Sequence, residues 1–253
     1  MRGVLGISAK TLTIVVPLRI EFEPFEDGNA RGDIEGIGFS GLVGAGRSEV
    51  MRAVFGLEPA DSGEILLEGK PIKIRDTTDA MKYGIGMVTE DRRGEGIIPA
   101  ASVKENASIA SIRKYMKGFF IDEKAELKAA KASVDSMAAR YASMDQQVQY
   151  LSGGNQQKII LSRLMLLDLN VLILDEPTRG IDVGAKKEIH QLMIDFAAKG
   201  YGVIMISSEM PEVLGMSDRI VVMHEGVVTG ELTRAEATQE AVMRLAVATK
   251  SAK

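Results

Sequence analysis

The 253-residue sequence contains no cysteine, and this excludes disulfide bonds, thiolate metal sites and a cysteine nucleophile. It also lacks an excess of basic residues. The formal net charge of −4 argues against a broadly basic nucleic-acid binder, although not against a local basic patch. The only two histidines, His190 and His224, stand without companion metal ligands. We therefore expect both to be ordinary surface residues.

Long apolar runs are also missing, since none approaches the ~20 residues needed to cross a bilayer. The N-terminal stretch "MRGVLGISAKTLTIVVPL" has some features of a signal peptide, but Lys10 interrupts it and no small-residue cleavage site follows. The β-branched residues and partial alternation of residues 11–25 instead predict a strand. We expect a cytosolic protein in which any membrane role comes through a partner.

The chain is long enough for one large domain or for a core with a lobe, and its composition changes along its length. Residues 1–100 contain short apolar runs punctuated by glycine, which predict strands and turns. Residues 101–151 include "IDEKAELKAAKASVDSMAARYASM", whose alanine, lysine and glutamate content predicts a helix. In residues 152–253, helical stretches alternate with the apolar runs 171–177 and 201–209, as in a parallel sheet covered on both faces. We predict a core of residues 1–100 and 152–253, with 101–151 as a helical subdomain.

The stretch "GLVGAGRSEV" (Gly41–Val50) lies between a predicted strand and a predicted helix. It fits the phosphate-loop pattern G-x-x-x-x-G-K-[ST] at Gly41, Gly46 and Ser48, but Arg47 replaces the lysine. Glycines let successive N–H groups face a phosphate, and the helix N-terminus adds partial positive charge. A guanidinium keeps the charge but cannot reproduce the compact contact of an ammonium. Taken alone, the stretch fits either a nucleotide site or a structural glycine turn.

The run "VLILDEP" is an apolar strand that ends in two carboxylates, Asp175 and Glu176. In a nucleotide site, Asp175 and Ser48 would bind Mg²⁺, and Glu176 would polarise an attacking water. The alternative is a buried strand that merely ends in solvated acids. A third stretch, "LSGGNQQK", places Ser152 and two glycines directly before a helical run, which creates a second helix N-terminus suited to an anion. By itself it could equally be an ordinary helix cap.

These stretches, in this order and with a helical insert before the third, resemble the ATPase domain of ABC transporters. "LSGGNQQK" is similar to the signature motif of that family, and "LILDEPTRGIDVGAKKEI" to its Walker B motif and D-loop, with Asp182 in the D-loop. Together these motifs are highly specific. The resemblance implies an α/β fold: a P-loop (RecA-like) core with a mostly parallel sheet, an N-terminal antiparallel β subdomain and an inserted helical subdomain. It also implies a head-to-tail pair of domains, with each ATP between the phosphate loop of one and the signature of the other.

A closer resemblance covers roughly residues 33–248 and rests on "SGLVGAGRSE", "TEDRR", "LSGGNQQK", "DEPTRGIDVGAKKEI" and "SSEMPEVLGMSDRIVVMHEG". These stretches are similar to the second, C-terminal half of monosaccharide-importer ATPases, especially the ribose type. In that family two ATPase halves usually share one chain, and the second half characteristically carries arginine for lysine. The N-terminal region matches poorly, so Phe22 and Phe25 are only candidates for the aromatic residue that stacks on adenine.

The resemblance implies ATP and Mg²⁺ as cofactors and assigns site residues. The nucleotide-binding residues it implies are Gly41, Gly44, Ala45, Gly46, Arg47, Ser48, Glu49, Glu90 and Asp175. Those implied to hold Mg²⁺ are Ser48, Glu90 and Asp175. Those at catalytic positions are Glu176 and Ser208. Those that face the ATP of the partner domain are the signature residues Ser152, Gly153, Gly154 and Gln156, with Asp182 in the D-loop.

At three positions the sequence departs from the family pattern. Besides Arg47, Ser208 replaces the usual histidine and Glu90 the usual glutamine. A serine cannot hold positive charge near the γ-phosphate, and a carboxylate can approach Mg²⁺ but cannot donate as an amide does. Phosphoryl transfer depends mainly on positioning and charge stabilisation, so these changes should depress turnover more than binding. We expect an ABC-type ATP hydrolase domain with weak or absent hydrolysis of its own, whose signature serves the site of the partner half.

The partners that the resemblance implies are a second ATPase half, membrane permease subunits and, indirectly, a periplasmic sugar-binding protein, but no nucleic acid. They imply a peripheral location at the cytoplasmic face of the cell membrane. Two alternatives stay open. A soluble ABC-type ATPase acting on nucleic acid or ribosomes predicts coiled-coil insertions or basic arms, and neither is visible. A nucleotide-binding regulatory module would be recognised only from its partners. The choice of ribose over another sugar rests wholly on the resemblance.

Overall fold

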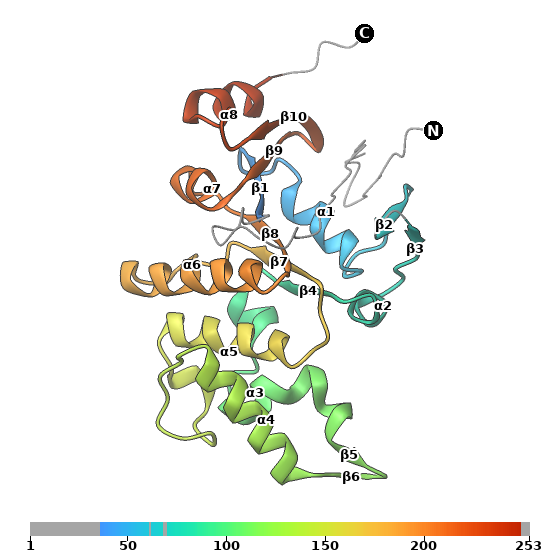
Figure 1. The fold of residues 1–253 in the computed structure, drawn as a ribbon, viewed down its shortest axis with the longest axis vertical. Helices are drawn as coiled ribbons and strands as arrows, with labels where there is room; N and C mark the ends of the chain where they lie inside the picture. The colour runs from blue at the N-terminus through green and yellow to red at the C-terminus, as the bar shows by residue number, and fades with distance from the viewer. Residues whose placement is uncertain (1–35, 61, 68–69, 249–253) are drawn as a thin grey trace. The chain divides into compact units, whose positions relative to one another are not determined.

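The computed structural model describes residues 36–60, 62–67 and 70–248 (Figure 1). The strand predicted within residues 11–25 and the candidates Phe22 and Phe25 lie outside these ranges. The chain divides into two compact units. The first comprises the residues up to 86, 170–176 and those from 196 onward, and the second comprises 87–169 and 177–195. The predicted boundaries of the helical subdomain, 101–151, are narrower than this second unit and stay a prediction.

Six of the described strands form one sheet in the order β10-β9-β1-β8-β7-β4 (Figure 1). Strand β1 pairs in parallel with β8 and β9, β7 pairs in parallel with β8, and β10 is antiparallel to β9. Every residue of β4, β7 and β8 is buried, as expected for strands covered on both faces. The strands are β1 (Gly36–Gly41), β4 (Ile85–Val88), β7 (Val171–Asp175), β8 (Gly202–Ile206), β9 (Arg219–His224) and β10 (Val227–Thr233). The mostly parallel α/β sheet predicted from the sequence is confirmed.

Helices pack on this sheet in the first unit, where the chain between strands returns along the sheet. They are α1 (Arg47–Val54), α7 (Met210–Met216) and α8 (Gln239–Ala246), and each contacts β1. A separate antiparallel hairpin consists of β2 (Ile65–Leu67) and β3 (Lys70–Ile72), and the short helix α2 (Thr77–Lys82) follows it. The small antiparallel sheet matches the β subdomain expected before the helical region.

The second unit is largely helical. Its helices are α3 (Val103–Ser108), α4 (Glu123–Ser136), α5 (Gly153–Met165) and, over residues 183–195, α6 (Val183–Ala198). A π-helical turn (Arg92–Gly96) precedes them, and 3₁₀ turns lie at Ile109–Tyr115 and Val148–Tyr150. The short hairpin of β5 (Met116–Lys117) and β6 (Phe120–Ile121) leads into α4. The inserted helical region predicted from the sequence is thus present.

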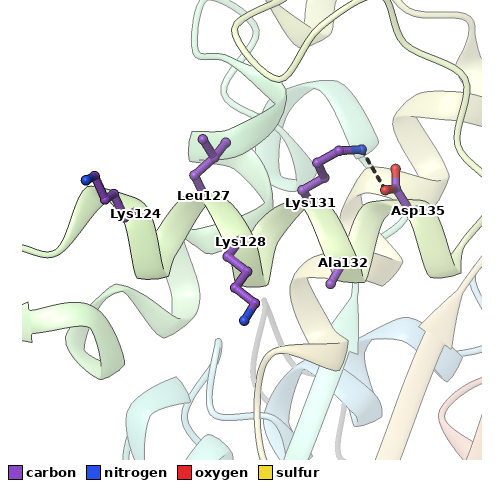
Figure 2. A pocket seen from close by; sticks show the side chains of 6 residues that line it. All are labelled: Lys124, Leu127, Lys128, Lys131, Ala132 and Asp135. Carbon is purple, nitrogen blue, oxygen red and sulfur yellow. Dashed lines mark hydrogen bonds and ion pairs between the residues drawn. The ribbon is translucent and has the colours of Figure 1, made fainter.

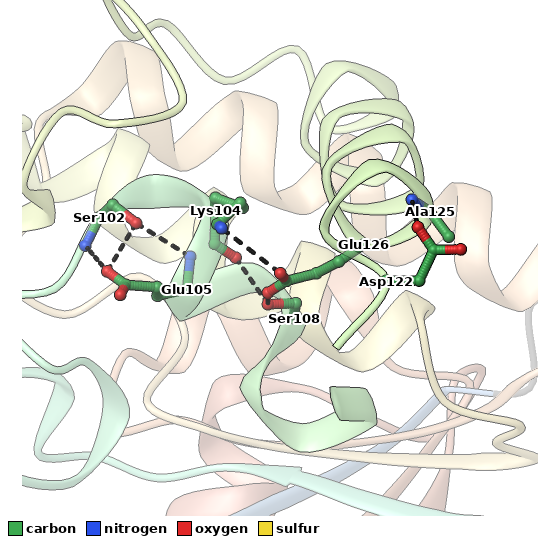
Figure 3. A network of polar contacts seen from close by, with 7 residues as sticks. All are labelled: Ser102, Lys104, Glu105, Ser108, Asp122, Ala125 and Glu126. Carbon is green, nitrogen blue, oxygen red and sulfur yellow. Dashed lines mark hydrogen bonds and ion pairs between the residues drawn. The ribbon is translucent and has the colours of Figure 1, made fainter. Parts of the chain in front are cut away.

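Polar groups fix where α3 and α4 begin (Figure 3). Ser102 and Glu105 form a capping box at α3, in which the Ser102 hydroxyl accepts from the Glu105 N–H at 3.1 Å. Asp122 caps α4 by accepting from the Ala125 N–H at 3.1 Å. The buried carboxylate of Glu126 on α4 accepts from the Ser108 hydroxyl at 2.6 Å. This last contact joins α4 to the C-terminal end of α3.

Helix α4 is shorter than the predicted helix over residues 121–144. It ends at Ser136, because the chain reverses at Ala138, which adopts a φ of 50°. The Ala138 carbonyl accepts from the buried Lys158 ammonium at 2.8 Å, and the Arg140 N–H donates to the Asn155 side chain at 2.8 Å. The predicted helix is therefore wrong beyond Ser136. The hydrogen bonds to α5 compensate for the helical hydrogen bonds that are lost where α4 ends.

Candidate nucleotide site

Strand β8 lies between β1 and β7, and all three run parallel. Their carboxyl ends therefore meet at one edge of the sheet, which is where open parallel sheets bind ligands. The segment after β1 is the phosphate loop, the segment after β8 carries Ser207 and Ser208, and the end of β7 carries Asp175 and Glu176. The fold of the first unit thus brings together three segments that the sequence singled out.

The phosphate loop depends on glycine at two positions. At Gly41 the backbone has a φ of 157°, and an added Cβ would lie 2.3 Å from the Met223 carbonyl oxygen. Gly46 adopts a left-handed conformation (φ 93°) as the N-cap of α1, a position that favours glycine. With no side-chain cap there, the N–H groups in the first turn of α1 are free to face an anion. Gly44 is exposed and Ala45 buried in the same loop.

Arg47 makes a protein contact that its sequence position did not reveal. Its side chain is only 8% exposed, and its Nη1 donates to the Ser207 carbonyl oxygen at 2.8 Å. Burial lowers the pKa of Arg47, while the nearby carboxylates of Glu176, Asp175 and Glu49 act in the opposite direction. The guanidinium thus joins the start of α1 to the end of β8 and partly neutralises the acids at the site. A direct contact of Arg47 with phosphate stays a prediction.

Asp175 is a buried carboxylate with one unsatisfied oxygen. The residue is 2% exposed, it accepts a hydrogen bond from the Ser48 hydroxyl, and its Oδ1 has no partner among the described residues. Burial raises the pKa of Asp175 to about 6, and the Ser48 hydrogen bond offsets part of this rise. A divalent cation would satisfy such an oxygen and compensate the buried charge. The pair Ser48 and Asp175 therefore fits the predicted Mg²⁺ site.

Glu176 follows Asp175 in a conformation that is uncommon for a residue with a side chain (φ 48°). Its N–H donates to the Ile206 carbonyl at 2.9 Å, and its Oε2 accepts from the Ser208 hydroxyl at 3.1 Å. Burial raises the pKa of Glu176, whereas the Ser208 hydrogen bond and the charge of Arg47 lower it. The two residues predicted at catalytic positions are thus in direct contact. The side chain that donates to the Glu176 carboxylate is thus a neutral hydroxyl and not a cation.

The second unit contains the signature segment. Helix α5 begins at Gly153, and its N-cap Ser152 is extended, with no side-chain hydrogen bond to the helix N–H groups. The Ser152 hydroxyl instead accepts from the Asn155 amide at 2.9 Å. The first turn of α5 therefore presents backbone N–H groups without a side-chain cap, the arrangement that binds anions at helix N-termini.

Both glycines of the signature lie where a side chain would collide. A Cβ on Gly154 would lie 2.5 Å from the Cβ of Ala185 at the start of α6. A Cβ on Gly153 would lie 3.0 Å from Arg92 Nη2 and 3.2 Å from the Gly180 carbonyl oxygen. Close packing of α5 against the D-loop and α6 thus accounts for the two glycines, in addition to any role toward a nucleotide.

The other predicted residues of the second unit make local contacts. Gln156 is buried, and its amide donates to the carbonyls of Val148 and Leu151, each at 3.2 Å, so it holds the segment before α5. Asp182 accepts from the Ala185 N–H at 2.9 Å and thereby fixes the start of α6. The roles of both residues toward a partner ATP stay predictions.

Glu90 also belongs to the second unit, where it forms an ion pair with Arg179. Arg92, two residues later, was not among the residues predicted for the site. Its Nη1 donates to the Arg179 carbonyl at 3.3 Å, and its Nη2 lies beside Gly153. The one available signal was its place in "TEDRR", a stretch that counted toward the resemblance. The role of Glu90 toward Mg²⁺ stays a prediction.

Other features of the described residues give weaker evidence of a functional site. The outer face of α4 lines a shallow hollow of about 460 Å³, in which Lys131 pairs with Asp135 at 2.7 Å (Figure 2). That hollow has neither a glycine loop nor the carboxylate pair of the first unit. No group of three or more His, Asp or Glu side chains in the described ranges is placed to hold a metal ion. Within the same ranges, every helix is too short or too polar to span a membrane.

Comparison with known proteins agrees with the geometry. Residues 33–179 match the family described as ABC transporter. A putative ribose/galactose/methyl galactoside import ATP-binding protein of Rhizobium etli is 56% identical over 210 residues, covering 83% of this chain and 40% of the relative. A ribose import ATP-binding protein of Rubrobacter xylanophilus is 54% identical over 213 residues, covering 84% of this chain and 43% of the relative. The chain thus spans less than half the length of these curated relatives.

Among solved structures, a dimeric ATP-binding cassette in a post-hydrolysis state, bound to ADP and Pi, matches with a TM-score of 0.73. The match covers 92% of this chain and 97% of that one, and at 21% identity it bears on the fold alone. The family match covers more than half of the chain and includes the phosphate loop, the signature and the carboxylates that end β7. This chain belongs to the ABC transporter family.

Proposed function

We propose that this chain is the ATP-binding, weakly or non-hydrolysing half of the ATPase of an ABC monosaccharide importer, with ribose as the favoured sugar. In this role it binds Mg-ATP at its phosphate loop and presents its signature helix to the nucleotide held by a second ATPase half. The observation that carries the proposal is the contrast between Arg47 and Ser208, which make protein contacts, and the retained pair Ser48 and Asp175.

Binding depends mostly on parts that the sequence has kept. The glycine loop and the uncapped start of α1 offer N–H groups to the phosphates, and these groups do not depend on the residue at position 47. Ser48 and Asp175 would hold Mg²⁺, which when bound supplies charge neutralisation at the phosphate oxygens. Glu49 adds a carboxylate near Arg47, which helps to retain the guanidinium in its buried position.

Hydrolysis requires charge stabilisation that this site supplies poorly. Glu176 can accept a proton from water, but its hydrogen-bonding partner is the neutral hydroxyl of Ser208. The guanidinium of Arg47 donates to the Ser207 carbonyl, so part of its donor capacity is committed to the protein. Because catalytic groups contribute most when they act together, the loss of the lysine and the histidine should reduce turnover far more than affinity.

The sugar and the partners follow from relatives rather than from residues of this chain. Two of the relatives carry ribose import in their names, and each is more than twice as long as the segment it shares with this chain. This supports a second ATPase half, membrane permease subunits, a sugar-binding protein acting indirectly, and a peripheral location at the cytoplasmic face of the membrane. The predicted domain boundaries and the C-terminal position of this half belong to the same proposal.

Nucleotide titration and phosphate release, measured on the same purified chain, test the proposal. We expect saturable binding of Mg-ATP, weakened about tenfold or more in Ser48→Ala because the Mg²⁺ ligand is lost. We expect phosphate release near background. Sustained turnover by the chain alone would contradict the proposed loss of hydrolysis, and failure to bind nucleotide would contradict the site itself.

A further inference from the structure

The turn that follows β4 holds Arg179 in the D-loop from two sides. Glu90 forms an ion pair with the Arg179 side chain, and Arg92 Nη1 donates to the Arg179 backbone carbonyl at 3.3 Å. All three residues belong to the second unit. One short turn therefore fixes both the side chain and the main chain of a residue that is far away in the sequence.

The same guanidinium also lies against the signature. Its Nη2 is 3.0 Å from the position that a Cβ on Gly153 would occupy, and the Gly180 carbonyl oxygen is 3.2 Å from that position. Gly153 is thus packed between Arg92 and the backbone of the D-loop. Arg92 contacts the two segments that the proposed function directs toward the nucleotide of the partner.

Arginine suits this position because its planar fork reaches two groups at once, whereas a lysine has a single ammonium. The arrangement has a cost. Burial lowers the pKa of Arg92, and its Nε is buried without a hydrogen-bond partner among the described residues. Unsatisfied buried donors are uncommon in folded proteins and call for an explanation.

Other contacts hold the same two segments together from behind. Lys158 on α5 pairs with Glu188 on α6 at 2.7 Å, and Gly154 packs against Ala185. The ion pair joins the bodies of α5 and α6, whereas Gly154 and Ala185 pack near the starts of these helices, close to Gly153 and the D-loop turn. Ile181 Cγ2 lies 3.3 Å from the position of a Cβ on Gly153, so the D-loop also packs directly on the signature, and Arg92 adds a polar contact to this packing.

We infer that Arg92 is a positioning residue that holds the signature and the D-loop in one fixed geometry for the nucleotide of the partner ATPase half. The inference rests on the proposed function. When the partner nucleotide binds at the signature, Arg92 keeps the D-loop at a fixed position relative to the signature. Without Arg92 the packing contacts remain, but the polar contact that fixes the two segments relative to each other is lost, and misplacement by about 1 Å is enough to slow a positioned reaction about 100-fold.

The test uses the assembled transporter, with Arg92→Ala and Arg92→Lys as variants and Arg93→Ala as the matched control. Arg93 lies in the same turn and is exposed. We expect Arg92→Ala to lower the kcat for ATP by about 10- to 100-fold with KM changed less than about threefold, because positioning acts on the transition state. Arg92→Lys should keep the charge yet recover only part of the rate, and Arg93→Ala should match the wild type.

Two further measurements separate the possible failures. Binding of nucleotide by this chain's own phosphate loop should be unchanged in Arg92→Ala, whereas a general folding defect would lower it as well. If Arg92→Ala does not fold, the kcat of Arg92→Lys decides the matter. A kcat of Arg92→Ala equal to that of Arg93→Ala, or a wild-type kcat in Arg92→Lys, would overturn the inference. Gly153→Asp in the same assay tests the proposed function alone: if it is inert, the signature assignment fails, whatever Arg92 does.

Discussion

Two helix N-termini of this chain face nucleotides in the proposed function, and they differ in the charged and polar contacts around them. At α1, in the first unit, Arg47 donates to the Ser207 carbonyl and Ser208 donates to Glu176, so charged and polar groups are bonded to one another. At α5, in the second unit, the Ser152 side chain does not cap the helix. Arg92 and the D-loop instead contact the signature at Gly153.

Under the proposed function, one nucleotide-facing surface has lost catalytic side chains while a second surface of the same chain keeps its geometry. The backbone N–H groups at the start of α1 do not depend on the side chain of Arg47, which is compatible with binding. The side-chain groups needed for turnover, in contrast, are lost when their residues are substituted. We therefore expect substitutions in the two units to have different consequences.

The largest effect is expected from Gly153→Asp in the assembled transporter. The new side chain would start 3.0 Å from Arg92 Nη2 and 3.2 Å from the Gly180 carbonyl, and its carboxylate would repel the phosphate of the partner nucleotide. We expect ATP hydrolysis to fall at least ~100-fold, as measured by phosphate release. Gly215→Asp, at an exposed glycine with nothing within 4 Å of an added Cβ, should leave the rate near that of the wild type. Equal rates for the two variants would contradict the signature assignment.

A smaller effect is expected from restoring the lost side chains. Arg47 and Ser208 belong to one network, because Arg47 contacts Ser207 and Ser208 contacts Glu176. We expect Arg47→Lys and Ser208→His each to raise turnover at this chain's site by less than about tenfold, and the double variant by more than the product of the two. Single-turnover phosphate release by this site in the assembled transporter measures the three rates. A large gain from Ser208→His alone would show that Arg47 is compatible with catalysis.

Asp175→Asn should stabilise the nucleotide-free chain, since burial raises the pKa of Asp175 from 3.8 to about 6. A raised carboxylate pKa means that ionisation costs folding free energy. The cost is fully present above pH 6 and disappears as the pH falls below 4. We expect a gain on the order of 2 kcal/mol at pH 7 that shrinks toward pH 4, measured by denaturant unfolding in a chelator.

Asp79→Asn supplies a control of opposite sign for this measurement. Hydrogen bonding with Arg75 lowers the pKa of Asp79 to about 2, so its ionised form stabilises the fold above pH 4 and loses that effect as the pH falls through 2. The asparagine should therefore destabilise the chain at pH 7. If Asp175→Asn also destabilised the chain, Oδ1 of Asp175 would have a partner in solution, and its suitability for Mg²⁺ would be in doubt.

A stability effect of similar size is expected from alanine at two helical glycines. A Cβ on Gly154 would lie 2.5 Å from that of Ala185, so Gly154→Ala should destabilise the chain by about 1–3 kcal/mol through overpacking of α5 against α6. Gly215→Ala in α7 meets nothing within 4 Å and should stabilise it by up to ~1 kcal/mol. Thermal unfolding of the two variants provides the comparison. Shifts of the same sign would show that α5 and α6 are not closely packed.

The positions of the motifs could be predicted from the sequence, because a strand, a glycine turn and a helix are local patterns. The start of α1 at Arg47 and the end of β7 at Asp175 follow from such patterns, whereas α5 begins at Gly153, within the glycines that were expected to precede the helix. Parallel pairing then placed the ends of β1, β7 and β8 at one edge. That step needs no information on individual side chains.

What the side chains do could not be predicted, because their partners come from remote segments. The sequence placed Arg47 at a phosphate, but the carbonyl it contacts lies 160 residues away. The same reason hid Arg92, whose contacts are Arg179 and Gly153. Helix α4 ends at Ser136 without glycine or proline, because Ala138 takes a positive φ and its carbonyl receives Lys158.

The most direct test of the asymmetry between the two units compares Arg47→Ala with Gly153→Asp by ATP hydrolysis in the assembled transporter. Arg47→Ala removes the contact with the Ser207 carbonyl and the charge beside Asp175 and Glu176, so nucleotide retention by this chain should weaken. Turnover at the partner site should then fall only in part, by less than about tenfold, whereas Gly153→Asp should abolish it. Equal and complete loss from both changes would contradict the account.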